Sequence, residues 1–416
     1  MTERSQARHD PLASPAVGTA PNDLIQPCSQ REPRAAAPPA PPADPPLALA
    51  FSGGGFRATL AALGVLRLLS DAGLLARVRY TSSVSGGSVA HGLFARHYPE
   101  LERESFSPEA LDRIVIVPAI EQISGHSLIR AMLLNIWRTW GPRTRTHLLA
   151  YMFDRWFYDG LLLKDLSQSC RFVFNASNLT TGVRFALERD VVGDYVVGRV
   201  ATDQTGLHLA NAVACSAAFP GAFAPFVMRG LDFPCADGRV PKLLDGGAYD
   251  NLGLEAIDDR PDVLVVALNA GGTFRTGRFG SVPLIRDLKR VNSLLYRQTV
   301  VLRERDMVER FKAWEQARRA GTEPPPWGRQ GVLFSLATTL DDPDPEWAGE
   351  RPERDELRIP LALAKTTFAR FPAVTCRRLV YRGWWLAGAA LSTFHRDVMP
   401  PDLPRWRPLP GETGDG

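Results

Sequence analysis

The chain has 416 residues, of which 45% are hydrophobic and 23% charged, and its formal net charge is +4. This length allows one large catalytic domain or two medium ones with a sizeable core. The weakly basic balance, without zinc-finger spacing or a compact basic stripe, excludes a DNA reader and predicts no nucleic-acid partner. Five scattered cysteines, never spaced as CxxC, predict neither a disulfide framework nor a zinc site, and they favour a reducing compartment.

The two ends of the chain differ in composition from its centre. Residues 1–46 end in a Pro/Ala-rich tract and are predicted to be disordered, and 396–416 are predicted to form a loose tail. The beginning lacks the order of a secretory signal, and no apolar run approaches the roughly 20 residues that span a bilayer. We therefore expect a cytoplasmic protein whose membrane contact is at most peripheral.

Two strand–turn–helix units begin the central region. An apolar strand at 47–52 leads through three glycines to a helix at 58–73, and a strand at 78–83 leads through SGG to a helix at 88–98. Two such units in succession predict a parallel α/β sheet. Further strand-like runs that end in small or polar residues lie at 171–179, 240–247 and 262–272.

Three later segments interrupt this pattern. Residues 108–165 are helical and rich in aromatic residues, which favours core helices over a lid or an interfacial surface. The segment 275–319 has twelve Lys or Arg against five Asp or Glu and predicts a long helix over 284–319. A solvated face is favoured there over contact with anionic lipid. The acidic residues 341–356 predict a surface loop.

The stretch TSSVSGGSVAHG places Ser85 at the end of the second predicted strand. A nucleophilic serine on a sharp turn needs small neighbours, which Ser83, Gly86 and Gly87 supply. The usual elbow pattern is Gly-x-Ser-x-Gly, and Ser83 stands in its first position. A helix cap explains the same residues about as well.

The glycine turn SGGGFRA, residues 52–58, exposes consecutive backbone N–H groups at the start of a helix. It suits either an oxyanion hole or a phosphate loop. The GKS or GKT ending of a P-loop and the GxGxxG spacing are both missing, which weakens the nucleotide interpretation. Arg57 is placed to stabilise negative charge, although a surface salt bridge explains it equally.

As a nucleophile, Ser85 would need a general base that removes the proton of its hydroxyl group. No histidine stands in a recognisable triad context, whereas LLDGGAYDNLG places Asp245 at a strand end followed by two glycines. A carboxylate there can point into a cleft beside another strand end. An Asx turn is the alternative explanation.

Three motifs in this order, GGGFRA, SVSGGS and DGGAYDNLG, resemble the motif set of the patatin-like phospholipases and their cytosolic phospholipase relatives. The resemblance covers 47–395 and implies a three-layer α/β/α fold with a central, mostly parallel sheet and a helix-rich insertion at 108–165. It implies a Ser–Asp dyad that needs neither metal nor cofactor. The implied nucleophile is Ser85, and the implied dyad aspartate is Asp245. The implied oxyanion-hole residues are Gly53, Gly54, Gly55 and Arg57, and those of the nucleophile elbow are Ser83, Gly86 and Gly87.

The expected function is hydrolysis of lipid esters, of the phospholipase or lysophospholipase type, through an acyl-enzyme. Two alternatives stay open: a catalytically inactive relative that contacts anionic membranes, and a phosphate or nucleotide binder that uses the SGGGFRA turn. Head group, acyl position and oligomeric state are not determined by these motifs.

Overall fold

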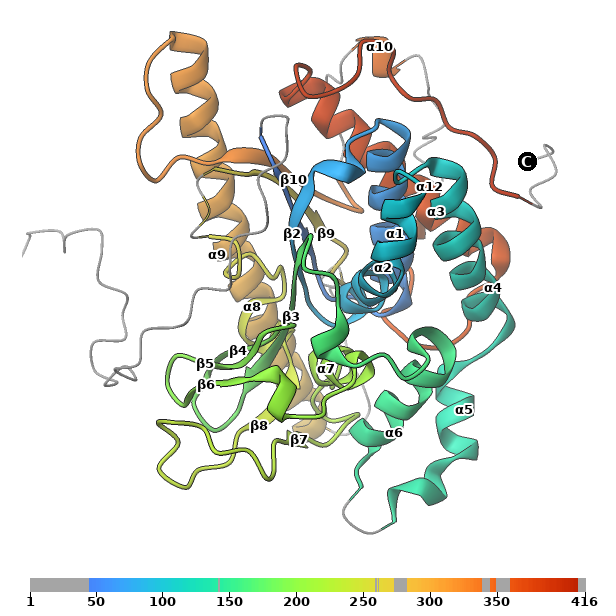
Figure 1. The fold of residues 1–416 in the computed structure, drawn as a ribbon, viewed down its shortest axis with the longest axis vertical. Coiled ribbons are helices and arrows are strands. Elements are labelled where there is room, and N and C mark those ends of the chain that lie inside the picture. Colours follow the sequence, from blue (N-terminus) through green and yellow to red (C-terminus); the bar gives the residue numbers. More distant parts are fainter. Residues whose placement is uncertain are drawn as a thin grey trace, which may run out of the picture.

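A ten-stranded mixed sheet organises the chain (Figure 1). The structure is a computed structural model, which describes residues 45–140, 143–258, 260, 262–272, 283–338, 345–348 and 360–410. The main strand order is β10-β9-β1-β2-β3-β4-β5-β6, with β8 paired to β3 and β7 to β8. The strands are β1 (Leu47–Phe51), β2 (Val78–Ser83), β3 (Arg171–Asn178), β4 (Val183–Leu187), β5 (Val191–Asp194), β6 (Gly198–Ala201), β7 (Phe226–Val227), β8 (Lys242–Asp245), β9 (Leu264–Asn269) and β10 (Gln330–Ser335).

The sheet has a parallel half and an antiparallel half. The strands β10, β9, β1, β2 and β3 run parallel, and all other pairings are antiparallel. In the parallel half the carboxyl ends of neighbouring strands meet at one edge, where ligands bind in open α/β sheets. The antiparallel pairing of β8 with β3 places the end of β8, at Asp245, opposite Ala176.

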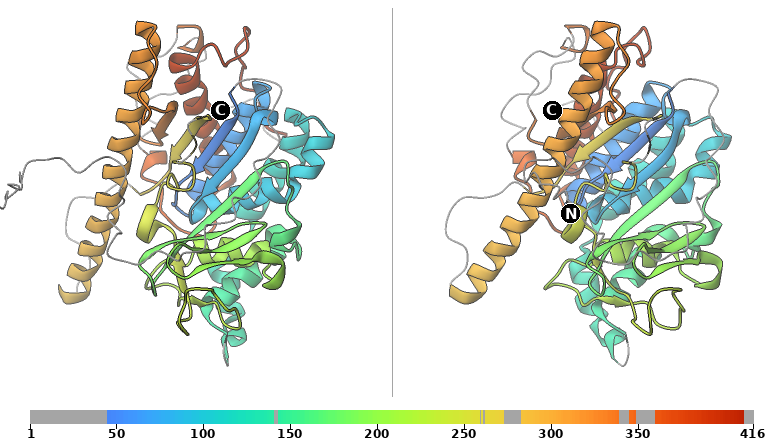
Figure 2. Two further views of the ribbon diagram at one scale, coloured as in Figure 1. Left: turned by 60° about the vertical axis from the view of Figure 1, so that its left-hand side comes forward. Right: turned by 90° about the vertical axis from the view of Figure 1, so that its left-hand side faces the viewer.

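Helices cover both faces of the sheet, as predicted (Figures 1 and 2). The described helices of eight or more residues are α1 (Phe56–Asp71), α2 (Gly86–Arg103), α4 (Val117–Gly125), α6 (Arg145–Phe153), α7 (Leu209–Ser216), α9 (Pro283–Ala320) and α12 (Ala373–Phe394). The shorter ones are α3 (Pro108–Leu111), α5 (Leu128–Leu134), α8 (Gly247–Asp250) and α10 (Pro345–Ala348). None of these described helices is both long and apolar enough to cross a membrane.

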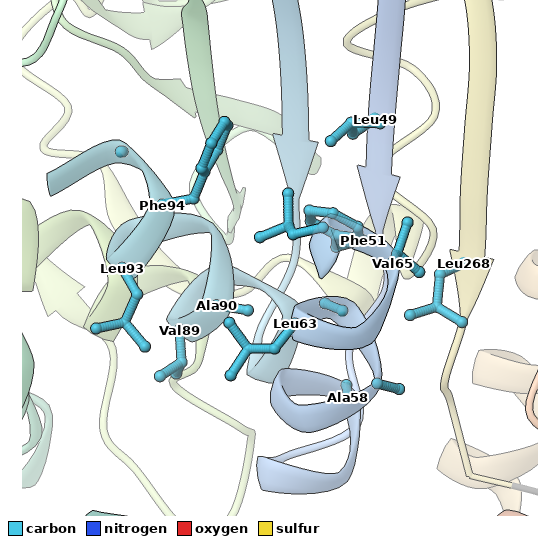
Figure 3. Close-up of a cluster of buried hydrophobic side chains, with 14 of the residues drawn as sticks. Leu49, Phe51, Ala58, Leu63, Val65, Val89, Ala90, Leu93, Phe94 and Leu268 are labelled. Carbon is cyan, nitrogen blue, oxygen red and sulfur yellow. The ribbon is translucent and has the colours of Figure 1, made fainter. Parts of the chain in front are cut away.

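The alternation of β1 divides the core between the two faces. Leu49 and Phe51 point towards α1 and α2 and join the main core cluster, as Figure 3 shows. Ala48 and Ala50 point the other way and pack in a smaller cluster with Met307 of α9. Because successive side chains of a strand face opposite sides, a strand buried on both faces is apolar at every position. The continuous apolar sequence LALAF follows from this double burial.

Three features of the structure were not predicted. The segment 128–140, predicted as part of a buried helical region, presents large apolar side chains to solvent. Residues 396–410 are not loose, because Leu409 is buried and Arg407 pairs with Asp71. Cys235 is disulfide-bonded, and the spacing of the cysteines, which predicted no disulfide framework, gave no sign of this bond. Residues 1–44 and most of 341–356 lie outside the described residues.

Candidate active site

Ser85 lies on the turn between β2 and α2 and has a backbone conformation that non-glycine residues rarely adopt. Its φ is 52° and its ψ is −121°, and α2 begins at the next residue, Gly86. Its N–H donates to the backbone oxygen of Ser216, at 3.1 Å, and to the Ser216 hydroxyl, at 3.0 Å. Such a strained conformation persists only where surrounding contacts hold it, and it is typical of a nucleophile elbow.

Asp245, 160 positions later in the sequence, lies beside Ser85. Its carboxyl group is close enough to the Ser85 side chain for Ser85 to lower its pKa, and its Oδ1 accepts from the Gly247 N–H at 2.8 Å. Burial raises the pKa of Asp245 to about 6, although the Ser85 side chain and the Gly247 N–H partly offset this rise. A carboxylate with a raised pKa is a better base near neutral pH than an ordinary aspartate.

The glycine turn packs directly against the serine turn. Gly54 and Gly55 have φ values of 155° and 62°, and a Cβ on Gly86 would lie 2.1 Å from the Gly55 oxygen. The Gly53 N–H donates to the Asn251 oxygen at 3.1 Å, whereas the N–H groups of Gly54 and Gly55 have no acceptor among the described residues. The two available donors of the predicted oxyanion hole are therefore those of Gly54 and Gly55.

A cavity of about 720 Å³ opens over these groups. Its wall includes Gly53, Gly54, Ser85 and Asp245, so the structure brings four of the predicted site residues together. The volume falls in the range of small-molecule pockets, and the described residues contain no group of three or more His, Cys, Asp or Glu side chains that could hold a metal ion.

Arg57 occupies a different position from the one the sequence indicated. It is 1% exposed, and its guanidinium donates to the carbonyl oxygens of Ala270, Ala362 and Ala364 and to the Thr366 hydroxyl. It lines a second, smaller cavity with residues 363–367 and not the cavity above Ser85. Arg57 is thus buried and does not line the cavity above Ser85; it ties α1 to the segments around 270 and 364.

A buried polar network lies behind the serine turn and explains Ser83. The Ser83 hydroxyl contacts His91 Nδ1 at 2.6 Å and the Ser88 hydroxyl at 2.9 Å, and Ser88 contacts Ser216 at 2.9 Å. His91 also contacts the Thr81 hydroxyl, and burial lowers its pKa to about 3, so the ring is neutral. The serine in the first elbow position is therefore a hydrogen-bonding residue and not merely a small one.

Sequence reasoning missed two residues of the cavity wall, Tyr296 and Asn251. Tyr296 of α9 is partly buried near Asp245 and helps to hold down the pKa of its carboxyl, although the buried tyrosine hydroxyl has no hydrogen-bond partner among the described residues. Asn251 lines the cavity beside Gly53, where its Oδ1 would lie 2.4 Å from an added Cβ. The motif DGGAYDNLG contained Asn251, but no local signal linked Tyr296 to the site.

The chain is similar to known proteins in sequence and in structure. A family model described as patatin-like phospholipase matches residues 49–258, about half of the chain, and no curated protein matches. Among solved structures, human GIVD cytosolic phospholipase A2 is similar at 13% identity with a TM-score of 0.49, covering 85% of this chain. VipD from Legionella pneumophila is similar at 15% identity with a TM-score of 0.29, covering 77% of this chain and 66% of VipD. The chain spans 63% of the length of the phospholipase A2 structure.

Proposed function

Because the chain belongs to the patatin-like phospholipase family, we propose that it is a serine acyl hydrolase that cleaves ester bonds of phospholipids or lysophospholipids. One observation carries the proposal: Ser85, held at a positive φ, lies beside the buried Asp245 in the wall of one cavity. Covalent acyl transfer requires a nucleophile in contact with its base, and this pair supplies both. Ser85 is the proposed nucleophile and Asp245 the proposed base.

The first half-reaction forms an acyl-enzyme. Asp245 accepts the proton of Ser85 while Oγ attacks the ester carbonyl carbon, and the carbonyl oxygen becomes an oxyanion. The N–H groups of Gly54 and Gly55 donate to this oxyanion and stabilise it. When the intermediate collapses, the ester C–O bond breaks and the leaving alcohol takes the proton from Asp245.

The second half-reaction releases the acid. Asp245 accepts a proton from a water molecule, whose oxygen attacks the acyl carbon, and the proton then returns to Ser85 as the acyl bond breaks. The raised pKa of Asp245, about 6, supports both directions of transfer, because it lies closer to neutral pH than the ordinary aspartate value. No histidine takes part in the scheme.

The cavity wall supports a lipid ester as the substrate. Phe219, Val300 and Val301 provide apolar surface for an acyl chain, and Arg290 and Arg297 of α9 provide positive charge for a phosphate group. A guanidinium group is suited to phosphate recognition. The combination favours a phospholipid or lysophospholipid over a neutral lipid. We propose that the catalytic unit spans 47–395 and acts from the cytoplasm at a membrane surface.

The alternative of a phosphate or nucleotide binder at SGGGFRA receives less support. The Gly53 N–H is already bonded to Asn251, and the Arg57 guanidinium is surrounded by carbonyl groups. A phosphate at this turn would therefore lack both the run of free donors and the cation that such loops provide. An inactive membrane-binding relative differs from the proposed hydrolase only in turnover, so activity decides between them.

The test is active-site labelling with a fluorophosphonate, together with hydrolysis of phospholipid, lysophospholipid and short-chain esters. We expect the wild-type protein to be labelled and active, Ser85→Ala to be unlabelled, and Asp245→Asn to lose at least about a hundredfold in rate. Equal labelling of wild type and Ser85→Ala would refute the assignment of the nucleophile. Thermal unfolding of each variant controls for loss of fold.

A further inference from the structure

A cluster of large apolar side chains is exposed on α5 and the short 3-10 helix that follows it, Ile136–Thr139. Six of the 17 exposed large hydrophobic residues of the described chain lie within the twelve positions 129–140, and Trp140, directly after the 3-10 helix, is 85% exposed. We call this cluster the α5 surface; it consists of Ile129, Leu133, Leu134, Ile136, Trp137 and Trp140. Exposed apolar residues scattered singly are normal, but a contiguous group marks an interaction site.

The rest of α5 explains why this face points outwards. Leu128 is fully buried, and Ala131 and Met132 pack against the main core. These three residues already supply the inward stripe of the helix. A solvated helix would carry polar residues on its other side, whereas α5 carries Ile129, Leu133 and Leu134 there. The helix is therefore apolar on both the buried and the exposed face.

The charged residues of the sequence segment that contains the α5 surface are all basic. Between Gln122 and Phe153 the sequence contains four arginines and neither Asp nor Glu. The Arg138 guanidinium stacks over the rings of Trp137, at 4.7 Å, and Tyr151, at 4.3 Å. Arg130, Arg143 and Arg145 are exposed. An apolar face with aromatic residues, in a sequence segment whose charged residues are all basic, is complementary to the interface of an anionic bilayer.

The other basic segment, α9, differs in this respect. Most charges in its C-terminal half are in ion pairs, including those of Arg303 with Asp258, Arg310 with Asp306, and Arg318 with Glu315. Its N-terminal half exposes Val291, Leu294 and Leu295, and thus offers a second apolar candidate. The α5 surface is the stronger of the two, because only it combines exposed tryptophans with a neighbouring sequence free of acidic residues.

The α5 surface is connected to the candidate active site through packed helices. The Thr146 hydroxyl of α6 donates to the Ala224 oxygen, in the same loop as Phe219 of the cavity wall. Helix α5 packs against α6, and α6 packs against α7, whose Ser216 hydroxyl accepts from the Ser85 N–H. Figure 1 shows α5 and α6 beside α7, at the lower end of the molecule.

We propose that the α5 surface docks on anionic lipid membranes. Leu133 and Leu134 enter the boundary of the acyl chains, Trp137 and Trp140 lie at the level of the head groups, and Arg130 contacts lipid phosphates. The inference deepens the proposed function by naming the surface through which the hydrolase reaches its substrate. The docking itself requires no turnover, so it can be measured separately.

The experiment measures sedimentation of the full chain, in the Ser85→Ala background, with vesicles of phosphatidylcholine alone and of phosphatidylcholine mixed with phosphatidylglycerol. We expect stronger binding to the mixed vesicles. The double variant Leu134→Ser, Trp140→Ser should bind at least about tenfold more weakly, since burial of one large apolar side chain is worth a factor of ten or more. Arg130→Glu should weaken binding to the mixed vesicles only.

Matched controls use exposed apolar residues elsewhere. Trp327→Ser should leave vesicle binding unchanged. Quenching of the tryptophan fluorescence by brominated lipid should be lost in the double variant Trp137→Phe, Trp140→Phe. Three results would overturn the proposal. The first is unchanged vesicle binding by the double variant Leu134→Ser, Trp140→Ser, and the second is a loss of binding that occurs only in the double variant Val291→Ser, Leu295→Ser. The third is a concentration-dependent dimer that Trp140→Ser abolishes. The last assigns the surface to a second copy of the chain.

Hydrolysis of a soluble short-chain ester by the same surface variants, with Ser85 restored, separates the two proposals. We expect wild-type rates there, because the α5 surface does not line the cavity. Vesicle binding without any ester hydrolysis would refute the proposed function and leave the docking surface standing. Hydrolysis without any vesicle binding would do the reverse.

Discussion

Replacing Gly86 by alanine tests whether the serine turn and the glycine turn act as one unit. An ideal Cβ on Gly86 would lie 2.1 Å from the Gly55 oxygen and 2.4 Å from the Gly55 nitrogen. Since ordinary contacts of this kind are about 3.4 Å or longer, the two backbones must separate by more than about 1 Å. Gly55 supplies one of the two proposed oxyanion donors, so the same movement displaces that donor from the reacting oxygen.

The expected effect on rate is larger than that on stability. A misplacement of about 1 Å in a catalytic group costs on the order of a hundredfold in rate, and overpacking costs about 1–3 kcal/mol of unfolding free energy. We expect Gly86→Ala to be folded at room temperature, with fluorophosphonate labelling and ester hydrolysis lowered about a hundredfold. Thermal unfolding gives the stability in the same samples.

The matched control is Gly125→Ala, at the end of α4, where an added Cβ meets nothing within 4 Å and φ is not positive. It should be labelled at the wild-type rate. If Gly86→Ala were also labelled and active at the wild-type rate, the close approach of the two turns would not matter for the chemistry, and the assignment of the oxyanion donors would be refuted.

Three further predictions concern groups around the dyad. The rate of ester hydrolysis should rise as the pH increases through about 6, because Asp245 must lose its proton to act as the base and its pKa is raised to about 6. A rate that stays constant between about pH 5 and 7 would contradict this prediction. Tyr296→Phe removes a group that lowers this pKa, so the rise should move to higher pH, and an unchanged pH profile would exclude such a role for the hydroxyl. Ser83→Ala leaves His91 and Ser88 each short of a buried partner and should lower the unfolding free energy by about 1–3 kcal/mol in denaturant titration; wild-type stability would show that the network is not needed.

The sequence by itself determined the elements that begin the fold. The strands predicted at 47–52 and 78–83 are β1 and β2, the helix predicted at 58–73 is α1, and the one at 284–319 lies within α9. These predictions succeeded because apolar periodicity and glycine turns are local properties of the chain. The order of the three motifs likewise sufficed for the family, since each motif is contiguous in sequence.

Tertiary structure decided which side chains meet. Ser85 and Asp245 come together because β2 and β8 pair with the same edge of β3, whose other edge is taken by β4, and no local pattern specifies that order. Arg57 is held among carbonyl groups by a segment more than 300 positions away, and Tyr296 reaches the dyad from α9. Likewise, a buried helix and the exposed α5 surface are both rich in apolar residues, so their sequences do not distinguish them. Only the packing of the folded chain shows that the α5 surface is exposed.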